Sequence, residues 1–193
     1  MRSAAAPRPS APGDDELVAR TAAGEEAAFR LLVDRWERDV LAFLTHMTGS
    51  RDDAEDLAQE TFVRVFRQAG SYRAEGRFRS WLLRIAGNLA RSRHRRRRLL
   101  KWLPLDLERH DVASATPSAD RRLEAEQTAD VVRAAIARLP VRQRQALVLH
   151  RFQGLRYVEV AEAMGTSLAG VESLIQRALA GLRADLIRRG ETP

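Results

Sequence analysis

The stretch SRDDAEDLAQETFVRVFRQAG, residues 50–70, predicts a capped amphipathic helix and indicates the class of the fold. Ser50 is placed to cap this helix, and Asp53, three residues later, completes a pattern similar to a capping box. The apolar side chains recur at the spacing of one helix face: Ala58, Phe62, Val65, Phe66 and Ala69. The other face holds Asp56, Glu60, Val63 and Arg67. The stretch therefore predicts a helix with a polar, partly acidic outer face.

Helical periodicity extends in both directions from this stretch. Upstream, apolar residues between Leu17 and Leu44 make one or two amphipathic segments that stop near Gly49. Downstream, SYRAEGRFRS at residues 71–80 predicts a loop. The next helix is expected to pack through Phe78, Trp81 or Leu82, Ile85 and Leu89. Helical rather than alternating patterns return after residue 123, with a break at Pro140, so the predicted fold class is all-α.

A change in composition divides the chain into two predicted helical domains. From residue 99 the pattern dissolves into a segment with prolines and small polar residues, which predicts a flexible linker over 99–124. The first domain is expected at 14–98 and the second at 125–190. Residues 1–13, rich in Pro, Ala and Ser, are expected to be a disordered tail. The sequence thus predicts two small helical domains joined by a linker.

The composition excludes several classes of function. The chain has no cysteine, which removes disulfides and cysteine-based zinc sites. Its four histidines lack metal-ligand spacing: His46, His94, His110 and His150. No apolar run approaches the roughly 20 residues that span a bilayer, and no acid, base and nucleophile residues cluster as in an active site. We therefore expect a soluble cytoplasmic protein that is not an enzyme, needs no cofactor or metal and does not insert into membranes.

Charge is distributed in blocks along the chain, although the net charge is +7. Residues 14–60 hold 13 acidic and 5 basic residues, whereas residues 61–101 hold 13 basic residues and the single acid Glu75. An acidic block beside a basic block predicts two partners of opposite electrostatic character.

The basic block ends in RSRHRRRR, residues 91–98. Such runs are usually solvated surface. Here, however, the arginines continue a polar stripe at helical spacing: Arg84, Asn88, Arg91, Arg95 and Arg98. The loop just upstream carries Tyr72, Arg73 and Arg77, and aromatic residues mixed with arginines suit single-stranded nucleic acid. Tyr72 and Phe78 are equally compatible with an ordinary core.

Residues 154–186 have the spacing of a helix-turn-helix. Ala161 is the small residue at the crossing, Gly165 can take a positive φ in the turn, and Val171 anchors the second helix, with Ser167 as its N-cap. The residues predicted to point outward are Ala169, Glu172, Ser173, Gln176 and Arg177, which can meet base edges. Arg156 and Tyr157 can hold phosphates. A generic helical hairpin with a solvated face is the alternative.

Four blocks in the same order resemble one known family. They are DDAEDLAQETFVRVF (52–66), GRFRSWLLRIAGNLA (76–90), LPVRQRQALVLHRFQGLRYVEVAEAMG (139–165) and VESLIQRALAGLR (171–183). Together they resemble a bacterial extracytoplasmic-function (ECF) sigma factor of the sigma-70 class. The resemblance covers residues 14–98, which would be sigma region 2, and 125–187, which would be sigma region 4.

The resemblance implies roles for particular residues. Docking on core RNA polymerase, at the β′ clamp helices, is implied for Asp53, Asp56, Gln59, Glu60 and Val63. Reading and melting of the minus-10 element is implied for Tyr72, Arg73, Arg77, Trp81, Arg84, Asn88, Arg91 and Arg95. Reading of the minus-35 duplex is implied for Arg156, Tyr157, Ser167, Ala169, Glu172, Ser173, Gln176 and Arg177. The β flap of the polymerase, promoter DNA and an anti-sigma factor are the further partners implied.

The predicted function is therefore that of a transcription initiation factor in the bacterial cytoplasm, associated with the nucleoid when active. The alternative is a helix-turn-helix repressor or activator that works alone, with a helical dimerisation domain. Symmetry separates the two hypotheses, because such a repressor would dimerise on a palindrome without polymerase.

Overall fold

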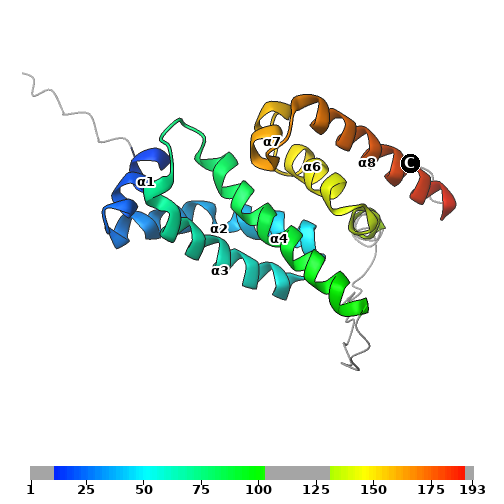
Figure 1. Ribbon diagram of the computed structural model, residues 1–193, viewed down its shortest axis with the longest axis horizontal. Coiled ribbons are helices and arrows are strands. Elements are labelled where there is room, and N and C mark those ends of the chain that lie inside the picture. The colour runs from blue at the N-terminus through cyan, green and yellow to red at the C-terminus, as the bar shows by residue number, and fades with distance from the viewer. Residues whose placement is uncertain (1–10, 103–130, 190–193) are drawn as a thin grey trace, which may run out of the picture.

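The first domain is built from four helices and a short 3-10 turn. The computed structural model describes residues 11–102 and 131–189 (Figure 1). In the first range the elements are α1 (Asp14–Ala22), α2 (Glu26–Thr48), α3 (Arg51–Gln68), η1 (Ala69–Ser71) and α4 (Phe78–Trp102). Within the two described ranges no residue is in a strand, so the predicted all-α class is confirmed.

The second domain contains the predicted helix-turn-helix. A helical segment at 131–138 precedes α6 (Val141–Arg151), α7 (Tyr157–Met164) and α8 (Leu168–Arg188). Gly165 ends α7 with a φ of 60°, a conformation that glycine adopts without strain. Val171 is fully buried, and the Ser167 side chain accepts a hydrogen bond of 3.1 Å from the Gly170 amide. The turn, the anchor and the cap predicted from the sequence are confirmed.

The corner between α2 and α3 is fixed by local hydrogen bonds. Gly49 ends α2 in the left-handed region with a φ of 73°. Ser50 then caps α3, its hydroxyl accepting a hydrogen bond of 3.3 Å from the Asp53 amide. Thr48 ties the corner together, because its hydroxyl lies within hydrogen-bond distance of the Leu44 and Ser50 carbonyls, either of which can accept its proton, and it accepts from the Ser50 amide. The predicted N-cap is confirmed, and the corner sets the direction of the first turn of α3.

The core of the first domain lies among α2, α3 and α4. Phe43, Phe78 and Leu82 are almost completely buried there, and Trp81 is only partly buried. Phe66 was predicted to lie on the buried face of its helix. This prediction is wrong, because Phe66 is 46% exposed. Its ring lies at the edge of the core, 5.1 Å from that of Phe29. Phe66 therefore adds apolar area to the outer surface of α3.

Helix α4 extends beyond the C-terminal boundary that the sequence predicted for the first domain. It continues to Trp102, four residues past the expected end of the first domain at 98. Arginine, leucine and lysine favour helix, and the first residue that would stop it is Pro104. The remainder of the predicted linker, the tail at 1–10 and residues 125–130 and 190 lie outside the described residues.

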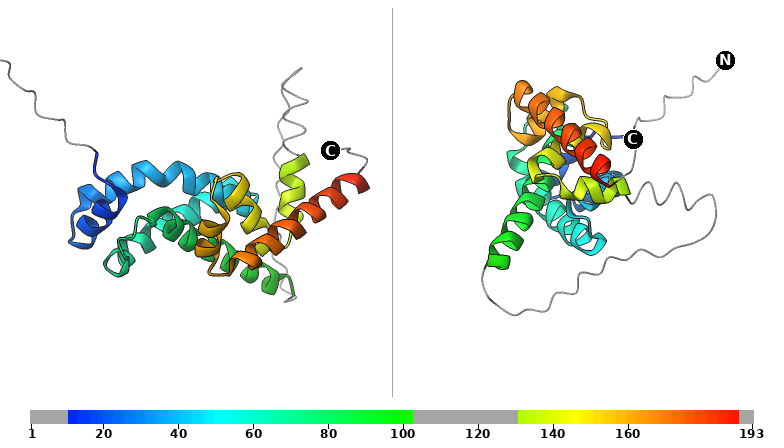
Figure 2. Two further views of the ribbon diagram at one scale, coloured as in Figure 1. Left: turned by 90° about the horizontal axis from the view of Figure 1, so that it is seen from above. Right: turned by 90° about the vertical axis from the view of Figure 1, so that its right-hand side faces the viewer.

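The two domains pack against each other along α4, which lies between α3 on one side and α6 and α7 on the other (Figures 1 and 2). Arg144 of α6 donates a hydrogen bond of 2.6 Å to the Met47 carbonyl at the end of α2. Arg79 of α4 donates one of 2.5 Å to the Gln153 carbonyl. Burial lowers the pKa of Arg144. The buried apolar side chains of the two domains also form one continuous cluster.

Candidate polymerase and promoter interfaces

The loop after α3 and the start of α4 form a pocket where most predicted minus-10 residues meet. Its lining includes Tyr72, Arg73, Arg77, Trp81 and Arg84. Glu162 of the second domain also lines it, with an oxygen 2.9 Å from Arg77 Nη1. Aromatic faces and guanidinium groups in one pocket can stack on an unpaired base and bind its phosphate. The structure thus gathers these five predicted residues, and it adds an acid that the sequence analysis did not place here.

Asp15 of α1 holds the loop in place. Tyr72 donates a hydrogen bond of 2.6 Å to Asp15 Oδ1, and the Gly76 amide donates one of 2.7 Å to Oδ2. The Tyr72 ring lies 5.0 Å from that of Trp81. Burial, and then the hydrogen bond to Asp15, raise the pKa of Tyr72. The role of Asp15 was not predicted from the sequence, because nothing local connects residues that are 57 and 61 positions apart.

The remaining minus-10 residues follow one face of α4. Asn88 is exposed and accepts a hydrogen bond from Arg91, and Arg95 is exposed one turn further on. Arg91 is only partly exposed, since the second domain lies beside it. Burial, and then the nearby charge of Arg142 on α6, lower the pKa of Arg91. The stripe exists as predicted, but the second domain partly covers its first turns.

The predicted minus-35 residues lie on α7 and α8. Ala169, Glu172, Gln176 and Arg177 are exposed, and Ser173 is partly buried. Ser173 supports Arg177, whose Nη2 donates a hydrogen bond of 2.5 Å to the serine hydroxyl. The outward placement of these side chains agrees with the helical spacing of the sequence.

The first turn of α7 is closed by Arg156 and Glu159. The Arg156 amide donates a hydrogen bond of 2.7 Å to Glu159 Oε2, and its guanidinium lies 3.2 Å from Oε1. The hydrogen bond from Arg156 is the main cause of the lowered pKa of Glu159. Tyr157 is partly buried against His150, with ring centroids 4.8 Å apart. Of the two residues predicted to contact phosphates, Arg156 is therefore exposed to solvent, whereas Tyr157 is partly buried.

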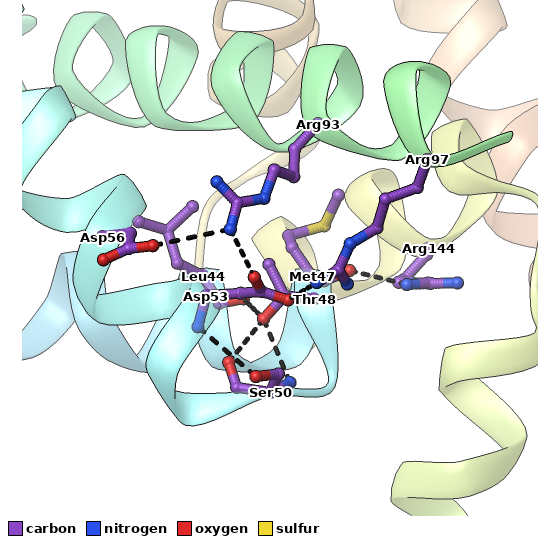
Figure 3. Close-up of polar contacts among 9 residues, drawn as sticks. All are labelled: Leu44, Met47, Thr48, Ser50, Asp53, Asp56, Arg93, Arg97 and Arg144. Carbon is purple, nitrogen blue, oxygen red and sulfur yellow. Dashed lines mark hydrogen bonds and ion pairs between the residues drawn. The ribbon is translucent and has the colours of Figure 1, made fainter. Parts of the chain in front are cut away.

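Four of the five predicted polymerase contacts lie on the outer face of α3. Asp56, Gln59, Glu60 and Val63 are exposed, and Val63 is 45% exposed. Phe66 of the same helix is also exposed and extends the apolar area, which was not predicted from the sequence. Asp53 differs from the other four, because its side chain is only 8% exposed and is directed toward α4 (Figure 3).

Two further features, a cluster of metal-ligating side chains and a membrane-spanning helix, are absent from the described residues. Among residues 11–102 and 131–189, no group of three or more His, Asp or Glu side chains could hold a metal ion. No helix within those ranges is both long and apolar enough to cross a bilayer.

Comparison with known proteins identifies the family. Residues 32–99 match sigma-70 region 2 and residues 129–182 match sigma-70 region 4. The chain is 34% identical over 172 residues to the ECF RNA polymerase sigma-E factor of Haemophilus influenzae, covering 86% of this chain and 90% of the relative. It is 38% identical over 171 residues to the ECF RNA polymerase sigma factor SigM of Mycobacterium tuberculosis, covering 88% and 82%. The chain belongs to the ECF sigma factors of the sigma-70 class.

Two solved structures have a similar fold. CnrH, in complex with the cytosolic domain of CnrY, superposes with a TM-score of 0.68 at 26% identity, covering 91% of this chain and 97% of CnrH. The sigma factor RpoE of Bartonella quintana, in complex with the anti-sigma factor NepR, gives a TM-score of 0.63 at 22% identity, covering 83% and 96%. The second likeness concerns the fold alone.

Proposed function

We propose that this sigma factor binds core RNA polymerase, directs it to promoters and helps to open the DNA, acting by binding and not by catalysis. One observation supports the proposal most strongly. The first domain carries an exposed, acidic and partly apolar face on α3 and a polar, arginine-rich face on α4, while the second domain carries a helix-turn-helix. These are three surfaces of different chemistry, and an initiation factor needs a protein contact and two kinds of DNA contact.

The outer face of α3 is the proposed contact to the polymerase. Asp56 and Glu60 supply negative charge, and Val63 and Phe66 supply exposed apolar area on the same helix. An apolar centre with a charged rim is typical of a specific protein interface. The β′ clamp helices are the partner proposed for this face, and the β flap is the partner proposed for the second domain.

The pocket beside α4 is the proposed site for the minus-10 strand. A base that leaves the stack needs an aromatic surface and a grip on its phosphate, and Trp81, Tyr72 and Arg73 offer these groups. The exposed residues of α8 are proposed to read the minus-35 duplex, with Arg156 on a phosphate. The protein would then act in the cytoplasm on the nucleoid, and an anti-sigma factor would restrain it, as NepR binds RpoE.

Charge reversal on α3 tests the polymerase contact. Asp56→Arg with Glu60→Arg should abolish binding to core polymerase, because the face would become basic, and circular dichroism should remain unchanged since both side chains are exposed. Binding is measured by competition against a labelled sigma factor. The matched control is Glu37→Arg with Asp34→Arg on α2. Unaltered co-purification of the α3 variant with core polymerase would contradict the docking proposal.

Arg177→Ala tests the reading of the minus-35 duplex. If Arg177 contacts a base, the variant holoenzyme should lose about 1–3 kcal/mol on promoters with the preferred element, and much less on others. Run-off transcription from genomic DNA, followed by mapping of the start sites, supplies the promoters. An equal loss on every DNA would instead indicate a phosphate contact. Binding of a palindrome by the free protein as a dimer would favour a repressor.

A further inference from the structure

The carboxylate of Asp53 joins the start of α3 to the arginine run of α4 (Figure 3). Arg93 donates a hydrogen bond of 2.6 Å from Nη2 to Asp53 Oδ1, and Arg97 Nη2 lies 2.5 Å from Oδ2. Each carboxylate oxygen therefore has its own guanidinium. Asp56, in contrast, is 68% exposed and lies 3.5 Å from Arg93.

The surroundings of Asp53 favour an internal role over a contact with another protein. A buried carboxylate is strongly destabilising unless its charge is paired. Here Oδ1 accepts a hydrogen bond from Arg93, and Oδ2 forms an ion pair with Arg97 that lacks hydrogen-bond geometry. The Asp53 backbone is held by the cap of Ser50, at the corner that Thr48 fixes. The hydrogen bond to Asp53 is also the main cause of the raised pKa of Arg93. A docking partner could reach Asp53 only by displacing both arginines.

The two arginines lie on the face of α4 opposite to the predicted DNA stripe. Successive residues of a helix are turned by about 100°, so Arg93 and Arg97 lie about 40° apart. By the same geometry Arg84, Arg91 and Arg95 lie about 160° to 200° from Arg93. The contacts agree, since the first pair meets α3 whereas Arg84 lines the pocket beside the second domain.

We propose that Asp53 is a positioning residue that holds Arg93 and Arg97 on α3, so that only the opposite stripe of α4 faces promoter DNA. The basic run then has two parts. Arg93 and Arg97 pair with Asp53 and fix α4 to α3, whereas Arg91 and Arg95 on the opposite face bind phosphates. This inference rests on the proposed function of α4 and assigns Asp53 a role different from the polymerase contact that the resemblance implied.

Asp53→Asn, compared with the matched variant Asp56→Asn, tests the proposal in the full-length chain. Asp53→Asn should keep the affinity for core polymerase and should bind a non-promoter duplex more tightly, because Arg97 is released and Arg93 keeps only its 3.5 Å contact with Asp56. The slope of log K against log salt should steepen by about 0.9 for each released arginine that reaches a phosphate. Asp56→Asn should show the converse, a weaker affinity for core polymerase with an unchanged slope. Loss of polymerase affinity in Asp53→Asn at an unchanged slope would overturn the proposal.

A second variant keeps the test valid if Asp53→Asn does not fold. The triple variant Asp53→Asn, Arg93→Gln, Arg97→Gln removes the charges together and leaves no unpaired buried charge. Its holoenzyme should bind promoter and non-promoter DNA with the salt slopes of the wild type, because the two arginines do not contact phosphates. A shallower slope would show that they do, and would overturn the proposal. Wild-type holoenzyme that failed to prefer promoter DNA would contradict the proposed function instead.

Discussion

At the scale of single residues, Gly87 decides how closely the two domains approach. A Cβ atom at this position would lie 2.2 Å from Gln145 Nε2 and 3.1 Å from its Cδ, and Gln145 is completely buried. Among the described residues neither amide atom of Gln145 has a hydrogen-bond partner. The amide therefore lies directly on the backbone of α4, in space that only a glycine leaves open.

Gly87→Ala should destabilise the full-length chain. Overpacking of this kind costs about 1–3 kcal/mol, which exceeds the gain of up to about 1 kcal/mol from replacing a glycine inside a helix. Urea denaturation measures the difference, and Gly70→Ala is the control, because nothing lies within 4 Å of a Cβ there. Adding Gln145→Ala should recover part of the loss. A Gly87→Ala variant more stable than the wild type would show that the domains are not packed in this way.

Residues whose role is local could be predicted, and those with distant partners could not. Ser50, Ser167 and Gly165 act within a few positions of themselves, so the sequence pattern was sufficient. Arg144 reaches a carbonyl 97 positions away, and Arg93 reaches Asp53 at a separation of 40. Such partners become neighbours only when helices pack, so no spacing rule could have indicated them.

At the scale of elements, the recognition helix α8 starts at a defined cap. Ser167 accepts a hydrogen bond from the Gly170 amide, and Gly170 itself lies in the first turn. Glycine is a poor helix former, so the start of α8 depends on its cap more than an alanine-rich start would.

Ser167→Ala should therefore lower stability by about 0.5–2 kcal/mol, the usual range for loss of an N-cap. Thermal and urea unfolding of the full-length chain measure it. Ser173→Ala is the control on the same helix, because its side chain contacts Arg177 and caps nothing. Equal stability of the two variants would mean that the cap does not determine where α8 begins.

At the scale of the whole molecule, the second domain covers part of the surface that the first domain would offer to DNA. Glu162 of α7 pairs with Arg77 at the edge of the pocket proposed for the minus-10 strand. Arg91 of the stripe lies beside α6, near Arg142. A DNA strand that enters the pocket must therefore compete with a carboxylate of the same chain.

Glu162→Gln should strengthen the binding of a single-stranded oligonucleotide by the free protein. The pair is partly exposed, so the gain should be at most about 1 kcal/mol, or about five-fold. Fluorescence polarisation measures it at low and high salt. Glu159→Gln removes the same charge from the same helix, but Glu159 pairs with Arg156 inside the second domain, so it should have a smaller effect. Equal gains in both variants would indicate a general charge effect.

The sequence by itself determined the helices, their caps, the helix-turn-helix and the separation of acidic and basic blocks, because each depends on residues within a few turns of one another. Only the tertiary structure decided that Asp53 faces inward, that Asp15 holds the loop and that the second domain lies along α4. Those features depend on burial and on contacts between helices distant in the chain. A carboxylate in the acidic block and an arginine in the basic run look like surface charges until packing places them together.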